Sequence, residues 1–164
     1  MRLRIAGIAN DSIVDGPGLR FAVFTQGCPH HCPGCHNPHT HDFEAGREAD
    51  TEEILAMIRK NPLLDGLTLT GGEPFCQAEA CTALARSAHA MGLNVWCYSG
   101  YSFEELLHGR EEWRTLLENI DVLVDGRFRI EERSLECCYR GSSNQRLIDV
   151  SRSLASGQAV QWNK

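Results

Sequence analysis

The sequence predicts an α/β protein, a partial, open parallel β/α barrel of about six strands. Segments typical of strands alternate with segments typical of helices, which is the pattern of βαβ units and a mainly parallel sheet. The chain has 164 residues, whereas a complete eight-fold barrel takes about 250 residues. We therefore expect one domain over residues 1–164 and a barrel that does not close.

Six segments have the residue content of strands. Residues 2–9 alternate in polarity, and residues 19–25 follow the turn signal Asp15-Gly-Pro-Gly18 and carry aromatic and β-branched side chains. The four remaining candidates are short and mostly apolar, and they comprise residues 67–69, 93–98, 120–124 and 146–150.

Four helices are expected between these strands, over residues 51–61, 77–91, 103–107 and 113–117. Thr51 is the expected N-cap of the first helix because Glu52 and Glu53 follow in its first turn, where they favour the helix dipole. Pro62 ends that helix, and Gly92 is the expected C-cap of the second.

Polar or glycine-rich segments follow several of these strands. They are the cysteine loop at residues 27–38, Gly71-Gly72, Ser99-Gly100 and Asp125-Gly126. Ligands of parallel sheets bind at the carboxyl ends of the strands. We therefore expect these segments to gather at one edge of the sheet.

Composition and charge exclude several classes of protein. The net charge of −6 argues against a general nucleic-acid-binding protein, which needs a basic surface. No apolar run approaches the roughly 20 residues of a membrane span, and the N-terminal residues lack a secretory pattern. The cytoplasm is therefore the expected location. Residues 126–164 nevertheless carry 7 basic and 4 acidic side chains, and this segment either faces an anionic partner or is a solvated basic surface.

Cys28, Cys32 and Cys35 form a Cys-x3-Cys-x2-Cys cluster, which is the most informative motif of the chain. A 4Fe–4S cluster normally takes four thiolates, one per iron. Three thiolates would leave one iron open for another ligand, and such an iron is a site for chemistry. A Cys3His zinc site is the alternative, with a fourth ligand from one of the histidines His30, His31, His36, His39 and His41.

The other five cysteines show no disulfide framework. Cys76, Cys81 and Cys97 are expected to be small core residues or incidental thiols. The adjacent pair Cys137 and Cys138 has poor geometry for holding one cluster, so we expect ordinary thiols there as well.

The residues around the cysteines resemble those of a known family. Asp15-Gly-Pro-Gly-Leu-Arg20, the cysteine motif followed by His36-Asn37, and Thr70-Gly-Gly-Glu-Pro74 resemble the activating enzymes of glycyl-radical proteins. These enzymes are a branch of the radical S-adenosylmethionine (SAM) superfamily. Three later segments resemble the activases of anaerobic (class III) ribonucleoside-triphosphate reductase, namely Tyr98-Ser-Gly-Tyr101, Val122-Leu-Val-Asp-Gly-Arg-Phe128 and Arg140-Gly-Ser-Ser-Asn-Gln-Arg146. The resemblance extends from about residue 13 to residue 150.

The resemblance implies a radical SAM oxidoreductase and its mechanism. Cys28, Cys32 and Cys35 hold the 4Fe–4S cluster, and the amino and carboxylate groups of SAM occupy the fourth iron. Reductive cleavage of SAM gives a 5′-deoxyadenosyl radical, which takes a hydrogen atom from a glycine near the C-terminus of the reductase. The implied partners are the reductase and flavodoxin or a similar reductant, and a homodimer is compatible with the family. No nucleic acid or membrane is implied.

The resemblance also implies contacts between the chain and SAM. Gly34, Cys35 and His36 lie along the adenine, and Pro33 precedes them where the superfamily often has an aromatic residue. A carbonyl of Gly71 or Gly72, or the Glu73 carboxylate, accepts hydrogen bonds from the methionyl ammonium. The remaining expected contacts are Ser99 at the ribose and Asp125, Gly126 and Arg127 near the SAM carboxylate, with Arg140 and Arg146 as weaker candidates.

Other functions remain open from the sequence alone. A compact radical SAM enzyme with a small-molecule substrate, such as a 7-carboxy-7-deazaguanine synthase, shares the Gly-Gly-Glu motif. A pyruvate formate-lyase activase is another glycyl-radical activase to consider, although those chains are typically longer. An electron-transfer or zinc-binding module is the alternative from a different class.

Overall fold

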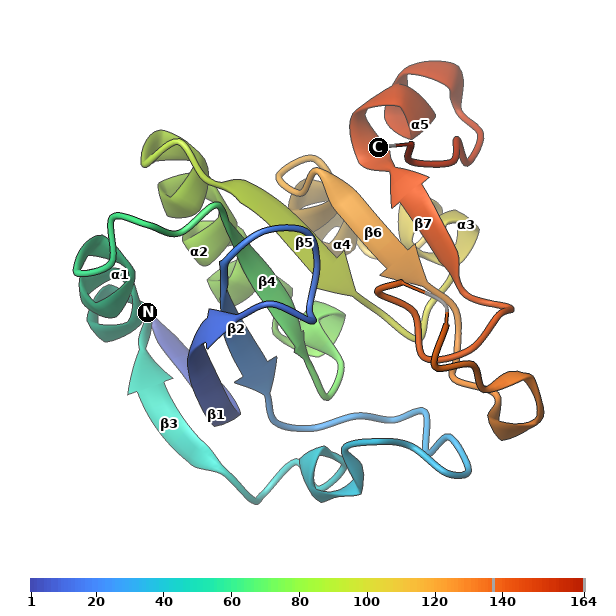
Figure 1. Ribbon diagram of the computed structural model, residues 1–164, viewed down its shortest axis with the longest axis horizontal. Coiled ribbons are helices and arrows are strands. Elements are labelled where there is room, and N and C mark those ends of the chain that lie inside the picture. The colour runs from blue at the N-terminus through green and yellow to red at the C-terminus, as the bar shows by residue number, and fades with distance from the viewer. Residues whose placement is uncertain (137, 164) are drawn as a thin grey trace.

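The computed structural model describes residues 1–136 and 138–163. Within these residues one seven-stranded sheet runs through the molecule in the order β3-β1-β2-β4-β5-β6-β7 (Figure 1). Its strands are β1 (Arg2–Ser12), β2 (Arg20–Thr25), β3 (Arg47–Asp50), β4 (Gly66–Gly71), β5 (Asn94–Tyr98), β6 (Val122–Asp125) and β7 (Arg146–Asp149).

The centre of the sheet is parallel and its edges are antiparallel. Strands β2, β4, β5 and β6 pair in parallel, whereas β1 is antiparallel to both β2 and β3, and β7 is antiparallel to β6. The predicted α/β class with a mainly parallel, open sheet is confirmed. The six predicted strands are all present, and the structure adds β3, a four-residue strand of charged residues around Ala49 that no apolar pattern announces.

The helices are α1 (Thr51–Arg59), α2 (Ala78–Ala90), α3 (Phe103–Leu107), α4 (Glu111–Leu117) and α5 (Val150–Ser156), with short 3-10 turns at Pro38–Thr40, Pro74–Gln77 and Ile130–Glu132. In Figure 1, α2 and α4 lie behind β4, β5 and β6, while α5 follows β7 at the edge of the sheet. The predicted N-cap Thr51 is wrong, because the Asp50 side chain caps α1 by accepting from the Glu52 N–H. Thr51 is instead a buried residue of the first turn.

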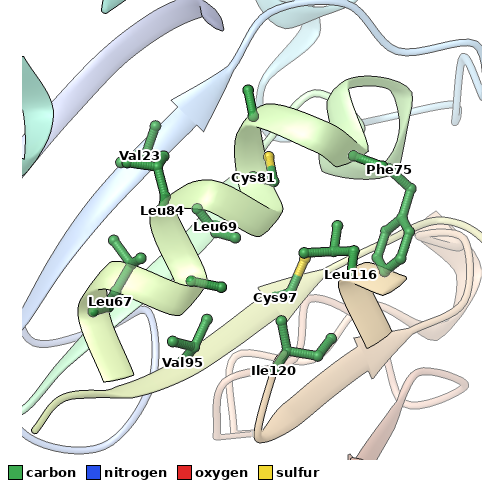
Figure 2. Close-up of a cluster of buried hydrophobic side chains, with 14 of the residues drawn as sticks. Val23, Leu67, Leu69, Phe75, Cys81, Leu84, Val95, Cys97, Leu116 and Ile120 are labelled. Carbon is green, nitrogen blue, oxygen red and sulfur yellow. The ribbon is translucent and has the colours of Figure 1, made fainter. Parts of the chain in front are cut away.

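The main core lies between the sheet and these helices. Alternate residues of the central strands face it, including Leu67 and Leu69 of β4 and Val95 and Cys97 of β5. Figure 2 shows these side chains beside Cys81 and other apolar residues of α2 and α4. Cys81 and Cys97 are fully buried there, which confirms that they are core residues.

The other face of the sheet carries an aromatic cluster. Trp96 packs edge-on against Tyr139 and Trp162, and Val122 and Val124 line the same cluster. Because strand residues alternate between faces, Trp96, Val122 and Val124 point away from the main core, which holds Val95, Cys97 and Leu123. No helix in the described ranges has the length and apolar character needed to cross a membrane.

Arg20 explains why Asp15-Gly-Pro-Gly18 lies against this face. Its guanidinium is fully buried, donates to the Thr68 hydroxyl (2.7 Å) and to the carbonyl oxygens of Pro17 (3.0 Å) and Leu67 (2.9 Å), and lies 5.7 Å from the Trp96 ring centroid. Burial lowers the pKa of Arg20 to about 10. The turn is thus fixed at the amino end of β2, whereas the cysteine loop leaves from the carboxyl end of the same strand.

Leu69→Ala is expected to lower the free energy of unfolding by about 2–5 kcal/mol, because it leaves a cavity in the main core. Chemical denaturation of the purified protein measures this value. Leu63→Ala is the matched control, since Leu63 is 75% exposed and Leu69 is fully buried, and we expect a change below about 0.5 kcal/mol. Equal effects of the two substitutions would contradict the described core.

Candidate functional site

The carboxyl ends of the four parallel strands meet at one edge of the sheet, as the sequence predicted. β2 ends at Thr25, β4 at Gly71, β5 at Tyr98 and β6 at Asp125. The segments that leave these ends are the cysteine loop, the Gly-Gly-Glu turn, the Ser99-Gly100 turn and the segment that begins at Gly126. The candidate site is built from these four segments.

The cysteine loop is anchored where it leaves and re-enters the fold. The Gly27 N–H donates to the Thr40 carbonyl (2.6 Å), and the Cys28 N–H donates to the His41 carbonyl (3.2 Å). The side-chain amide of Gln26 donates to the carbonyls of His39 and Asp42. The loop between these anchors is therefore closed at its base, and Cys28, Cys32 and Cys35 lie beyond that base.

The three thiols differ in their burial and in their hydrogen-bond donors. The Asn37 N–H donates to the Cys35 sulfur (3.4 Å). Burial raises the pKa of Cys28 to about 11, and the His30 amide opposes this rise. Burial also raises the pKa of Cys32, against the effect of the Phe128 amide.

This set of three free thiols fits an iron–sulfur cluster held by three cysteines. Thiolates are the protein ligands of such clusters, and amide donors to their sulfurs stabilise the negative charge. Among the described residues, no three His, Cys, Asp or Glu side chains are gathered closely enough to hold a single metal ion. A 4Fe–4S cluster takes its thiolates on separate irons, so its ligands need not converge on one point.

Glu73 is the centre of the hydrogen bonds beneath this loop. Its carboxylate is fully buried and accepts from His30 Nε2 (2.6 Å), from the Ser99 hydroxyl (3.0 and 2.9 Å), and from the Gly100 (2.8 Å) and Phe75 (3.2 Å) N–H groups. A buried carboxylate needs such partners because it has lost its water. Glu73 therefore ties the Gly-Gly-Glu turn to both the cysteine loop and the end of β5.

Gly71 and Gly72 are needed because two backbone segments approach them closely. A Cβ on Gly71 would lie 2.5 Å from the Thr25 nitrogen, and Gly71 also has φ +94°. A Cβ on Gly72 would lie 2.4 Å from the Gly27 carbonyl oxygen, and the Glu73 N–H donates to the same oxygen (2.9 Å). The two glycines thus bring the turn against the base of the cysteine loop.

A cleft of about 610 Å³ opens beside the cysteine loop. His30, Cys32, Asp125, Gly126 and Arg127 are among its lining residues, so the structure brings these predicted positions together. The remaining lining residues are Pro33, Ser102, Glu105, Phe128, Arg129, Asn144 and Arg146.

Among the charged side chains that line the cleft, Asp125, Arg129 and Arg146 form ion pairs, whereas Glu105 and Arg127 form none with a described residue. Arg146 bonds both carboxylate oxygens of the buried Asp125 and also bonds Glu104 (2.7 Å), and the Asp125 hydrogen bond is the main cause that raises the pKa of Arg146. Arg127 is exposed and donates through Nε to His30 Nδ1 (3.3 Å). Among the described residues, Arg127 makes no ion pair with a carboxylate, so its charge is available to an anionic ligand in the cleft.

The other predicted residues lie outside the lining of the cleft. Gly34 has φ +73° and packs against Ile130, and the His36 ring lies 4.9 Å from the Phe128 ring. Residues 34–36 thus face the segment that follows β6. Ser99 is buried and its hydroxyl bonds Glu73 while accepting from the Tyr101 N–H.

His30 and Arg146 make contacts in the site that the sequence did not predict. The sequence predicts His30 only as an alternative metal ligand. The hydrogen-bond partners of its ring, Glu73 and Arg127, are 43 and 97 positions away along the chain. No local pattern marks such distant pairs. Cys76 and Cys138 are exposed, and Cys137 lies outside the described residues.

Comparison with known proteins agrees with this site. A family model described as a 4Fe-4S single cluster domain matches residues 14–148. The anaerobic ribonucleoside-triphosphate reductase-activating protein of Salmonella typhimurium is 34% identical over 141 residues, covering 81% of this chain and 90% of that protein. Proteins of the same name from Escherichia coli K12 (32% identical, 81% and 90% covered) and Enterobacteria phage T4 (34% identical, 82% and 86% covered) also match.

The chain belongs to the anaerobic ribonucleoside-triphosphate reductase-activating protein family. The resemblance of its motifs to that family is confirmed, and so is the 4Fe–4S cluster, which the matching family model carries in its description. The open zinc alternative is thereby decided in favour of iron and sulfur.

Among solved structures, QueE from Escherichia coli overlaps this member of the activating-protein family with a TM-score of 0.48 and 20% identity, over 61% of this chain and 53% of that one. The family assignment rests on the sequence relatives and not on this partial overlap.

Gly72→Ala is expected to disturb the cysteine loop, because the added Cβ would contact the Gly27 carbonyl oxygen. We expect a loss of about 1–3 kcal/mol in the free energy of unfolding and less iron bound per chain after anaerobic reconstitution. Gly7→Ala is the control, since a Cβ there meets nothing within 4 Å. If both variants bind iron like the unaltered protein, the close approach at Gly72 has no role in holding the loop.

Proposed function

We propose that this protein is the activating enzyme of an anaerobic ribonucleoside-triphosphate reductase, a radical SAM oxidoreductase that generates a glycyl radical on its partner. The observation that carries the proposal is the three-cysteine loop beside a cleft with an unpaired arginine, in a chain of the activating-protein family. The bound cluster and SAM supply the chemistry, which is reductive cleavage of SAM and formation of a 5′-deoxyadenosyl radical.

Cys28, Cys32 and Cys35 are the proposed cluster ligands, and the chain supplies no fourth thiolate within this loop. The amino and carboxylate groups of SAM take the remaining iron. His30 is not a competitor for that iron, because both of its ring nitrogens have protein partners.

Arg127 is the proposed partner of the SAM carboxylate, and its free charge at the cleft supports this role. Asp125 acts through Arg146 by holding that guanidinium at the cleft. Gly126, which also lines the cleft, allows the turn between Asp125 and Arg127 with its φ of +101°.

The Gly-Gly-Glu turn offers the SAM ammonium its backbone carbonyls at Gly71 and Gly72. The Glu73 carboxylate already accepts from four protein groups, so its proposed contribution is to hold the turn in place. Ser99 is the proposed residue near the ribose of SAM, and its hydroxyl donates a hydrogen bond to Glu73. Gly34, Cys35 and His36 are the proposed backbone stretch along the adenine.

The partner is the reductase, which the activating-protein relatives carry in their name. The finer features are proposals: a glycine near the C-terminus of the reductase as the target, flavodoxin or a similar protein as electron donor, a homodimer, a single domain over residues 1–164 and a cytoplasmic location. The relatives favour this function over a 7-carboxy-7-deazaguanine synthase, whose substrate is a small molecule.

Cys28→Ala, Cys32→Ala and Cys35→Ala are each expected to abolish the 4Fe–4S signal, since each removes one of three thiolates. Electron paramagnetic resonance of the anaerobically reduced protein measures this signal, first alone, then with SAM, then with SAM and the reductase. We expect SAM to change the cluster signal and an organic radical to appear on the reductase.

Cys138→Ala is the control and should keep both signals, because Cys138 is exposed and lies outside the cysteine loop. A colourless protein that retains stoichiometric zinc would contradict the proposed function. A glycyl radical formed by the Cys32→Ala variant would contradict that ligand.

Arg127→Met is expected to weaken SAM binding about tenfold or more, because a hydrogen bond to a charged group contributes roughly 1.5–3 kcal/mol. Equilibrium binding to the oxidised holoenzyme measures the Kd. Arg129→Met is the matched control from the same cleft, since Arg129 is paired with Glu132 (3.2 Å). An equal loss in both variants would indicate a general effect of cleft charge and not a specific contact.

A further inference from the structure

Arg127 is held at the cleft by its backbone and by its side chain. The side-chain amide of Asn144 donates to the Arg127 carbonyl (2.9 Å), and that of Gln145 donates to the Gly126 carbonyl (2.9 Å). At the far end of the residue, the guanidinium donates through Nε to His30 Nδ1 (3.3 Å). An exposed arginine is thus fixed at both ends, and its side chain is tied to the cysteine loop.

His30 is a rigid partner for this hydrogen bond. Its side chain is 4% exposed, and its Nε2 lies 2.6 Å from Oε1 of the buried Glu73. The ring meets the Tyr101 ring edge-on at 4.6 Å between centroids. Gly100 approaches it so closely that a Cβ there would lie 2.4 Å from His30 Cδ2. These neighbours hold the ring in one position, so the fold sets the position of Nδ1 independently of Arg127.

The two hydrogen bonds of the ring have a fixed direction. A guanidinium has only N–H donors, so His30 Nδ1 accepts from Arg127. The ring proton is therefore on Nε2, where it is donated to the Glu73 carboxylate. The imidazole thus presents an acceptor toward the cleft, and the buried Glu73 carboxylate keeps that acceptor in place.

The bond through Nε leaves the other edge of the Arg127 guanidinium free. Arginine has five N–H donors, one on Nε and four on the two terminal nitrogens. In the described part of the chain, the side-chain hydrogen bonds of Arg127 use Nε alone. The two terminal nitrogens can donate two parallel N–H groups, which is the geometry that binds a carboxylate bidentately.

Ordering Arg127 before a ligand arrives also favours binding. A long, exposed side chain loses rotamer freedom when it is fixed by a ligand, and this loss opposes association. The bond to His30 already restricts the Arg127 side chain in the free protein. Less freedom is therefore lost when an anionic ligand enters the cleft.

We propose that His30 is a positioning residue for SAM, which holds Arg127 by Nε so that both terminal nitrogens of the guanidinium bind the SAM carboxylate. This inference rests on the proposed role of Arg127 at that carboxylate. His30, Cys32 and Arg127 line the same cleft, so the oriented guanidinium lies in the cleft beside the cysteine loop. The contribution of His30 is made through Arg127.

His30→Gln and His30→Leu form a matched pair that tests the proposal. A glutamine amide can donate to Glu73 with its NH2 group and accept from Arg127 with its oxygen, whereas leucine can do neither. The readout is the Kd of the oxidised, reconstituted holoenzyme for SAM, with iron content as the measure of loading. The Kd for methylthioadenosine is measured in parallel, because this compound has the adenosine and a sulfur but no carboxylate.

We expect His30→Leu to weaken SAM binding about fivefold, because Arg127 is then no longer ordered in advance. His30→Gln should stay within about twofold of the unaltered protein, and neither variant should change the affinity for methylthioadenosine. Unaltered SAM binding in His30→Leu would overturn the proposal. An equal loss for SAM and methylthioadenosine, or equal losses in the Leu and Gln variants, would also overturn it, since a disturbed cleft would then explain the result.

Arg127→Lys provides a second route if His30→Leu binds little iron. It keeps the positive charge and leaves His30 and Glu73 in place, but its single nitrogen cannot bond Nδ1 and also bind a carboxylate as a fork. We expect SAM binding about fivefold weaker than in the unaltered protein. An Arg127→Lys variant with unaltered affinity would overturn the fork.

A double variant tests whether His30 acts through Arg127. In the Arg127→Met background, His30→Leu should change the Kd for SAM by less than about twofold, since residues that act through one contact are not additive. A loss of the same factor in both backgrounds would show that His30 acts on SAM by another route and would overturn the proposal.

The same measurements separate this inference from the proposed function. If the unaltered holoenzyme carries no 4Fe–4S cluster or does not bind SAM, both fail together. If it binds SAM and forms the radical on the reductase, and the Arg127→Met variant loses affinity while His30→Leu does not, the function stands and only the role of His30 is wrong.

Discussion

The buried carboxylate of Glu73 is the interaction on which the rest of the site depends. A carboxylate without water is destabilising unless donors replace the lost hydration. Glu73 receives donors from the cysteine loop, from the end of β5 and from its own turn. One charge therefore fixes the relative positions of three segments that carry the chemistry, because moving any of them would leave that charge unsatisfied.

The parallel centre of the sheet makes this convergence possible. β2, β4, β5 and β6 run in the same direction, so four loops leave from one edge. The glycines at 71 and 72 let the first two of these loops touch backbone to backbone. The opposite edge is held separately, by the buried Arg20 and the Asp15-Gly-Pro-Gly18 turn. Structural anchoring and chemistry are thus placed at opposite ends of the same strands.

The open architecture is consistent with a protein as substrate. The described sheet ends in the antiparallel strands β3 and β7 instead of closing on itself. An activating enzyme that acts on a glycine of a large partner needs a site that a polypeptide segment can reach. The cleft beside Cys32 and Arg127 lies at the carboxyl ends of the strands, where ligands of parallel sheets bind.

The sequence by itself determined the α/β class, the strands of the parallel centre, the cysteine motif and the family, because these depend on local spacing and periodicity. Only the tertiary structure decided what the polar residues of the site contact. Glu73 and Ser99, both expected near SAM, bond each other, Glu73 also bonds His30, and Asp125 bonds Arg146. These partners are 21 to 43 positions apart. A hydrogen bond over such a separation exists only after the sheet has brought the strand ends together, so no pattern along the chain announces it.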